Sequence, residues 1–264
     1  MAIALLLALI LILAGCILLF VSHPWWFPAG VAADAAAIDH DFHHAFWILG
    51  ALFIAAQLLL VLFLLRAWRR KGASGFSRGD WRLEIAWTIA IAALFFWFHA
   101  SGGHLWRNLR LHAAPSDSLQ IEVTGAQFQW YFRYPGPDGK LGRVDAQKFA
   151  AAEEGNPLGL DPEDPAGKDD IVSAQLVLPV NRDVLLQLRS QDVIHSLFIP
   201  AMRFKQDAVP GSVIPMHLRP TSVGNYEIAC AELCGLGHYR MRALVRVLSG
   251  ADFAAWLKAR SSQE

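Results

Sequence analysis

Two thiols, an imidazole, a carboxylate and a thioether lie within the stretch Cys230-Ala231-Glu232-Leu233-Cys234-Gly235-Leu236-Gly237-His238-Tyr239-Arg240-Met241. Thiolates and thioethers prefer soft metals such as copper, and imidazole binds both copper and zinc. A second imidazole is available from His195, in the run Asp192-Val193-Ile194-His195. One tetrahedral zinc ion needs fewer donors than this, whereas two copper ions with bridging thiolates would use them all. The spacing therefore predicts a dinuclear copper site with the side-chain ligands His195, Cys230, Cys234, His238 and Met241.

Two simpler explanations of this stretch are a disulfide between Cys230 and Cys234 and a structural zinc ion. The C-x3-C spacing differs from the C-x2-C that zinc sites usually have, and Met241 is a poor zinc ligand. Gly235 and Gly237 favour a tight loop over a helix. Together these features favour copper.

Other parts of the chain complete a family pattern. The metal-binding stretch, with the runs Asp192-Val193-Ile194-His195 and Lys205-Gln206-Asp207-Ala208-Val209-Pro210-Gly211 before it, closely resembles subunit II of cytochrome c oxidase. Leu83-Glu84-Ile85-Ala86-Trp87-Thr88 resembles the start of that family's last transmembrane helix. Thr124-Gly125-Ala126-Gln127-Phe128-Gln129-Trp130 resembles its aromatic segment. The resemblance extends from near residue 40 to residue 248.

The resemblance implies a cupredoxin-type barrel that holds a copper A centre, a pair of copper ions, in loops at one end. The family's ligands fall on the side chains named above and on the backbone carbonyl of Glu232. The Glu232 carboxylate is implied to reach a magnesium ion at the boundary with subunit I, which suits a hard oxygen donor.

The resemblance also implies a function. Cytochrome c would donate electrons to the copper pair, which would pass them to haem in subunit I, where oxygen is reduced to water and protons are pumped. The complex would be a proton-translocating cytochrome-c oxidase. This chain has no C-x-x-C-H haem-attachment motif, so the donor cytochrome is a separate partner. No nucleic-acid partner is expected.

Two further positions acquire roles from the resemblance. Glu84 would form the cytoplasmic entrance of a proton pathway into subunit I. Phe128 stands where the family usually places a tryptophan through which electrons enter. Trp130 follows two residues later, and alternation along a strand would put both rings on one face. Phe128 and Trp130 are therefore the candidates for electron entry.

Three other classes of protein deserve comparison. A quinol oxidase subunit shares the fold but lacks the copper cysteines, so Cys230 and Cys234 speak against it. The electron-transfer subunit of a copper A nitric oxide reductase has a similar module, with a different catalytic partner. A membrane-anchored copper-delivery protein needs neither a helical hairpin nor Glu84.

The N-terminal part of the chain is apolar enough to cross a membrane. The chain has 264 residues, 55% of them hydrophobic, and no net charge. Spans are predicted over Ile3–Val21 and Ala45–Leu65, and from Glu84 to near Trp106. The first of them contains Leu13-Ala14-Gly15-Cys16, which resembles a lipoprotein processing site. The apolar run continues past Cys16 and no positive region precedes it, which favours an uncleaved helix over a cleaved signal.

The positive-inside rule gives the orientation. The connection between the last two spans is rich in bases and has Asp80 as its one acid, so we expect it in the cytoplasm; the bases are Arg66, Arg69, Arg70, Lys71, Arg78 and Arg82. The C-terminal domain would then be periplasmic, on a bacterial inner membrane. Trp25, Trp26 and Phe27 fit an aromatic belt at the outer interface.

The rest of the chain predicts an all-β domain. Short β-rich runs separated by Pro and Gly turns are expected at Leu119–Val123, Phe128–Tyr134, Ala174–Leu178, Val184–Arg189, Val213–Leu218 and Ala243–Leu248. Residues 136–170 form a polar insert with nine acids and four bases, which suits either steering of a basic cytochrome or a solvated loop. The predicted organisation is a membrane helix at 1–22, a helical hairpin at 40–106, a cupredoxin-like barrel at 114–250 and a C-terminal helix or tail at 251–264.

Overall fold

The computed structural model describes residues 2–22, 28–69, 79–111, 113–149 and 155–261, and it contains two compact units. The helical unit comprises Met1–Pro28 and Ala37–Arg107. The β unit comprises Ala29–Ala36 and Asn108–Glu264. Each unit is described separately below.

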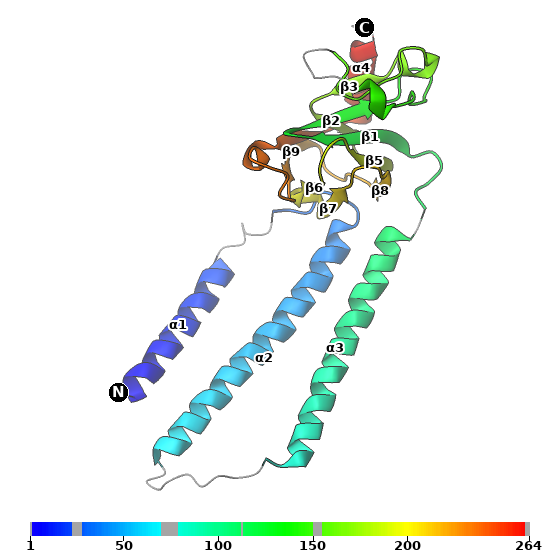
Figure 1. The fold of residues 1–264 in the computed structure, drawn as a ribbon. Coiled ribbons are helices and arrows are strands. Elements are labelled where there is room, and N and C mark those ends of the chain that lie inside the picture. The colour runs from blue at the N-terminus through cyan, green and yellow to red at the C-terminus, as the bar shows by residue number, and fades with distance from the viewer. Residues whose placement is uncertain (1, 23–27, 70–78, 112, 150–154, 262–264) are drawn as a thin grey trace. The chain divides into compact units, whose positions relative to one another are not determined.

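The helical unit consists of α1 (Ala2–Ser22), α2 (Ala35–Arg69) and the greater part of α3 (Trp81–Arg110), drawn blue to green in Figure 1. Within the described residues, α2 and α3 are long and apolar enough to cross a membrane. The first predicted span, Ile3–Val21, lies within α1. The predicted belt at Trp25–Phe27 and the predicted bases Arg70, Lys71 and Arg78 lie outside the described residues.

Both long helices extend beyond their apolar runs. The helix α2 begins ten residues before the predicted Ala45, and its first turns are polar. The Asp80 side chain accepts a hydrogen bond from the Arg82 amide (3.0 Å), so it caps α3. The helix therefore begins at Trp81, three residues before the predicted start at Glu84. Ser101 in α3 donates to the Asp41 carboxylate in α2 at 2.5 Å. Hydropathy locates the hydrocarbon-spanning part of each helix, whereas capping and polar contacts set its ends.

The β unit contains two five-stranded sheets, in the orders β3-β2-β1-β5-β8 and β4-β10-β9-β6-β7. Their strands are β1 (Leu119–Ala126), β2 (Gln129–Tyr134), β3 (Ile171–Ser173), β4 (Leu176–Pro179), β5 (Val184–Ser190), β6 (His195–Ile199), β7 (Phe204–Ala208), β8 (Ile214–Leu218), β9 (Gly224–Cys230) and β10 (Arg242–Leu248). Side chains from both sheets form one buried core, so the sheets pack face to face. This is the expected all-β barrel.

The sequence pattern did not predict four of these strands, namely β3, β6, β7 and β9. The strand β3 has three residues, and β7 (FKQDA) contains two charged residues. The strands β6 and β9 each carry a predicted metal ligand at one end, His195 and Cys230. Alternation of apolar and polar residues is weak in all four, and pairing with neighbouring strands stabilises them instead.

Helix α4 (Gly250–Ser261) closes the domain. Ser249 accepts a hydrogen bond from the Asp252 amide (3.1 Å), which caps the helix start. Phe253 is buried, and the Trp256 ring packs edge-on against Tyr134 at 4.9 Å between centroids. The C-terminal helix predicted within 251–264 is therefore present, and it begins one residue earlier, at Gly250.

A segment before α2 belongs to the β unit. The Val31 amide donates to the Ala201 carbonyl (2.8 Å), the Ala33 amide donates to the Arg219 carbonyl (2.9 Å), and Thr221 donates back to the Val31 carbonyl (2.9 Å). Val31, Ala32 and Ala35 are part of the core. The boundary predicted at residue 114 omits this segment, because hydropathy alone cannot detect an edge contact made by the chain between two helices.

The polar insert is anchored on a buried arginine. Arg133 in β2 pairs with Glu122 at 2.8 Å and with Asp170 at 2.6 Å, and it donates to the Gly142 carbonyl at 2.8 Å. All three side chains are almost fully buried. Within the insert, Asp161 pairs with Lys148 at 2.6 Å. Much of the insert's acidic charge is therefore used in holding the insert itself.

Replacement of Arg133 by alanine should lower the free energy of unfolding by about 3–5 kcal/mol, because it leaves buried carboxylates without their partner. Urea unfolding of the detergent-solubilised chain measures this. The matched control is Arg143→Ala, since the Arg143 side chain is 73% exposed and pairs with Asp161 and Asp164 at 3.3 Å. The control should cost at most about 1 kcal/mol. Equal losses for the two variants would mean that Arg133 does not anchor the insert.

Candidate metal centre

Strand pairing brings the predicted ligands to one end of the β unit. His195 opens β6 and Cys230 ends β9, and these strands pair antiparallel. The strand β9 also pairs with β10, so the chain between them returns Met241 beside Cys230, with the Cys230 amide donating to the Met241 carbonyl at 3.0 Å. Cys234 and His238 lie on this connecting loop, the ligand loop (Ala231–Met241), which ends in the short helix η6 (His238–Arg240).

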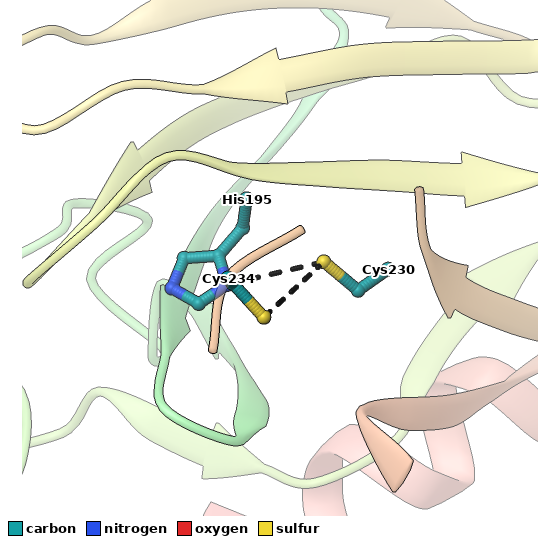
Figure 2. A group of neighbouring side chains, drawn as sticks. All are labelled: His195, Cys230 and Cys234. Atoms are coloured by element: carbon teal, nitrogen blue, oxygen red, sulfur yellow. Dashed lines mark hydrogen bonds between the residues drawn. The ribbon is translucent and has the colours of Figure 1, made fainter. Parts of the chain in front are cut away.

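The donor atoms of the candidate site face one another, and most of the residues that carry them are buried from solvent. Figure 2 shows the side chains of His195, Cys230 and Cys234 grouped together. Among the described residues, their ligand atoms all lie within 4.8 Å of one another. Cys230 Sγ is 3.9 Å from His195 Nδ1 and 3.2 Å from the Glu232 carbonyl oxygen. Cys234 Sγ is 3.6 Å from His238 Nδ1 and 3.7 Å from Met241 Sδ. All six predicted copper ligands are thus brought together.

The sulfur separation distinguishes a metal site from a disulfide. The Cys230 and Cys234 sulfurs are 3.8 Å apart and both cysteines are free, whereas a disulfide bond is about 2.0 Å long. Two thiolates bound at about 2.3 Å to one tetrahedral metal ion would lie roughly 3.8 Å apart. His195 and Met241 are fully buried and Cys234 is nearly so. The residues present therefore fit a buried soft-metal centre.

Burial also sets the acid–base chemistry of the centre. Burial, and after it the neighbouring Cys230, raises the pKa of Cys234 to about 11. The Cys234 thiol without metal therefore stays protonated at neutral pH, and metal binding must release its proton. Burial alone would raise the pKa of Asp192, but hydrogen bonds from His195 and from the Gln127 and Val193 amides lower it below its ordinary value. Asp192 thus remains an acceptor for the imidazole.

Two neighbouring residues had no predicted role. Asp192 Oδ1 lies 2.7 Å from His195 Nε2, and Gln127 Nε2 donates to the Cys234 carbonyl at 2.5 Å. The carboxylate three residues before His195 was a sequence signal, since metal-binding histidines commonly hydrogen-bond a carboxylate through their second nitrogen. The Gln127 contact joins residues 107 positions apart, so no local pattern reveals it.

The predicted electron-entry rings do not share a strand face. The strand β2 begins at Gln129, so Phe128 lies in the turn before it, and the expected alternation with Trp130 does not apply. Phe128 is 37% exposed, and a Cβ on Gly237 would overlap its ring, so the ring lies directly on the ligand loop. Trp130 is buried, with its ring edge-on to His195 at 5.9 Å between centroids.

Two predicted residues contribute differently. Glu232 places its carbonyl at Cys230, while its side chain is exposed. Glu84 belongs to the helical unit, in the first turn of α3, and is not part of the metal cluster.

Comparisons with known proteins agree with this arrangement. The family model described as cytochrome c oxidase subunit II, periplasmic domain, matches residues 119–248. The chain is 36% identical to the alternative cytochrome c oxidase subunit 2 of Bradyrhizobium diazoefficiens, over 98% of this chain and 91% of that one. The chain belongs to the cytochrome c oxidase subunit II family. It is also 31% identical to cytochrome c oxidase subunit 2 of Cereibacter sphaeroides, over 78% of this chain and 70% of that one.

The crystal structure of the periplasmic domain of subunit II of cytochrome oxidase from Bradyrhizobium japonicum is 28% identical, with a TM-score of 0.42, and covers 57% of this chain and 99% of that one. As a member of the cytochrome c oxidase subunit II family, the chain is a membrane-anchored subunit of a haem-copper oxidase, with two apolar helices followed by an extracytoplasmic cupredoxin-like domain. Membership implies a copper A centre, for which the His195, Cys230 and Cys234 cluster is the candidate site.

Proposed function

We propose that this chain is the electron-entry subunit of a terminal respiratory oxidase. It would accept electrons from cytochrome c at a dinuclear copper A centre and pass them to haem in subunit I, where oxygen is reduced to water and protons are pumped. The observation that carries this proposal is the buried cluster of two thiols, two imidazoles, a thioether and a carbonyl at one end of the β unit.

The protein's own residues suit electron transfer. A copper pair supplies a one-electron redox step at this place. His195, Cys230 and Met241 are fixed at the ends of paired strands, so the donors need to move little when the charge changes. Burial of these side chains excludes water, and no open position for a substrate is required of such a centre.

The exposed Glu232 carboxylate supports a second metal contact. Its carbonyl oxygen lies at Cys230 while its side chain faces away from the core, so one residue can serve both the copper site and a neighbouring ion. We propose, on the family resemblance, that this carboxylate binds magnesium at the boundary with subunit I.

The charges at the helix ends support the proposed membrane arrangement. Arg66 and Arg69 lie in the last turn of α2, and Arg82 lies in the first turn of α3. The positive-inside rule supports a cytoplasmic location for these ends and a periplasmic location for the β unit, on a bacterial inner membrane. We propose that α1 stays uncleaved, since its helix continues past Cys16 to Ser22.

Copper stoichiometry tests the centre. The full-length chain should bind two copper ions and give a mixed-valence electron paramagnetic resonance signal, and Cys230→Ser should abolish that signal by removing a bridging thiolate. Cys16→Ser is the matched control, because Cys16 is an exposed cysteine in α1, and it should leave both unchanged. One copper ion per chain, or stoichiometric zinc after copper reconstitution, would contradict the dinuclear assignment.

Phe128 is the proposed electron-entry residue, because it is exposed and lies on the ligand loop. Phe128→Ala should slow electron transfer from cytochrome c to copper by roughly tenfold, equivalent to about 1.4 kcal/mol in the barrier, without loss of copper. Stopped-flow absorbance measures this rate. Leu244→Ala, which removes an exposed apolar side chain from β10, should leave it unchanged. An unchanged rate in Phe128→Ala together with a slowed rate in Trp130→Phe would move the entry point to Trp130.

Glu84 is proposed as the entrance of a proton pathway into subunit I. The competing explanation is an acid that favours the start of α3 through the helix dipole, and its carboxylate does lie over Gly79 just before the helix. In the assembled oxidase, Glu84→Ala should slow haem reduction at the catalytic site by roughly tenfold or more while copper reduction stays at the wild-type rate. Flash or stopped-flow spectroscopy of both centres separates the two steps.

Asp80→Ala is the control for the dipole explanation, because Asp80 caps the same helix. It should cost about 1 kcal/mol of stability without slowing haem reduction. Equal slowing by both variants, or normal turnover in Glu84→Ala, would refute the proton-entrance role.

A further inference from the structure

Two hydrogen bonds from the two-residue turn between β1 and β2, and a third between Asp192 and His195, connect the turn to the candidate metal centre. Gln127 Nε2 donates to the Cys234 carbonyl at 2.5 Å, and the Gln127 backbone amide donates to Asp192 Oδ2 at 2.7 Å. The other oxygen of the same carboxylate, Oδ1, lies 2.7 Å from His195 Nε2. One residue therefore reaches ligands on both sides of the candidate site.

The turn and the ligands belong to different sheets. Gln127 lies between β1 and β2 of the first sheet, whereas His195 opens β6 and Cys234 follows β9 in the second sheet. Strand pairing within the second sheet fixes His195 and Cys230 relative to each other. It does not fix Cys234, which lies four residues beyond β9 in a loop. The Gln127 side chain supplies a direct hydrogen bond to the Cys234 backbone from the opposite sheet.

The loop backbone is shaped to accept this contact. Gly235 has a φ of +130°, and a Cβ there would lie 2.8 Å from Gln127 Nε2 and 3.2 Å from the Phe128 ring. A side chain at this position would therefore displace the amide from the Cys234 carbonyl. Similarly, a Cβ on Gly125 would lie 3.0 Å from the His195 ring. Both glycines let the turn approach the ligands closely.

The Asp192 contact determines which nitrogen of the His195 imidazole carries the proton. With Nε2–H donating to the carboxylate, Nδ1 carries the lone pair, and this is the nitrogen that faces Cys230 Sγ. Carboxylates that bond the second nitrogen of a metal-binding histidine set its tautomer and orientation, and their loss typically lowers metal affinity about 10–100-fold. The Gln127 amide holds that carboxylate in place.

We propose that Gln127 is a positioning residue for the metal centre, one that holds Cys234 through its side chain and His195 through Asp192. The inference rests on the proposed function only for the identity of the metal. Because the side chain bonds Cys234 and the backbone bonds Asp192, substitution of the side chain removes one link and leaves the other. The role of Gln127 can therefore be separated from that of Asp192.

The test uses the full-length chain loaded with copper and measures copper loss to a competing chelator, with the electron paramagnetic resonance and visible spectra recorded before competition. Gln127→Leu should release copper about tenfold faster and alter the spectrum, because the Cys234 carbonyl loses the hydrogen bond from the Gln127 side chain. Gln127→Glu keeps the length but places an oxygen against the carbonyl, so it should release copper faster still.

Asp192→Asn should also accelerate copper loss by at least about tenfold. In the double variant Gln127→Leu/Asp192→Asn the two effects should combine less than additively in free energy, since both side chains hold one ligand set. The matched control is Gln129→Leu, which removes the other glutamine beside this turn and should retain copper like the wild type. Thermal unfolding of each metal-free variant verifies that the fold is intact.

Wild-type copper retention and an unaltered spectrum in both Gln127→Leu and Gln127→Glu would overturn the positioning role. That result is distinct from failure of the proposed function, which would appear in the wild-type chain itself as binding of one copper or of zinc. In that case the same variants still test Gln127, with retention of the metal actually bound as the measurement. The hydrogen bonds of Gln127 hold the ligands, whichever ion they bind.

Discussion

Antiparallel pairing of β9 with both β6 and β10 is the constraint on which the metal centre depends. The pairing places His195 beside the end of β9 and returns Met241 to Cys230 across the mouth of the ligand loop. Soft donors from three strand ends then meet in a space that the two sheets keep dry. Ligands at the ends of paired strands keep their positions without metal more firmly than ligands on loops. The Cys234 segment lies on the ligand loop, so the strands do not support it in this way.

The polar insert follows from the same sheet packing. The strand β2 is largely buried on both faces, with Trp130 and Phe132 in the core and Arg133 buried on the other side. A buried guanidinium needs charge partners, and the insert supplies Asp170 and the Gly142 carbonyl while β1 supplies Glu122. The insert is therefore a cover for the outer face of the first sheet as well as an acidic surface. Its internal ion pairs favour the solvated-loop explanation for much of its charge.

Sequence reasoning was strongest where chemistry is local. The C-x3-C-x3-H-x2-M spacing concentrates four donor side chains in one loop region, and the structure brings them together with His195. Long apolar runs likewise located α2 and α3. It was weakest where a contact joins distant segments. The placement of Val31 in the core, the strands β6 and β9, and the bond from Gln127 to Cys234 all depend on tertiary neighbours that periodicity does not encode. The strand assumed for Phe128 failed because a two-residue turn ends one position later than the aromatic pattern suggested.

The turn at Gln127 and Phe128 carries both proposed roles of this end of the domain, electron entry and support of the ligands. Phe128 presents a partly exposed ring on Gly237, while its neighbour Gln127 bonds the Cys234 carbonyl past Gly235. Both glycines lie between the predicted ligands Cys234 and His238. Because neither has a side chain, neighbouring groups can approach the backbone of the ligand loop directly. The Phe128 ring, the proposed point of electron entry, can therefore contact the ligand loop. The side-chain amide of the adjacent Gln127 restrains the same loop through its hydrogen bond to Cys234. Close approach for electron transfer and rigid support of the ligands are then two consequences of the same pair of glycines.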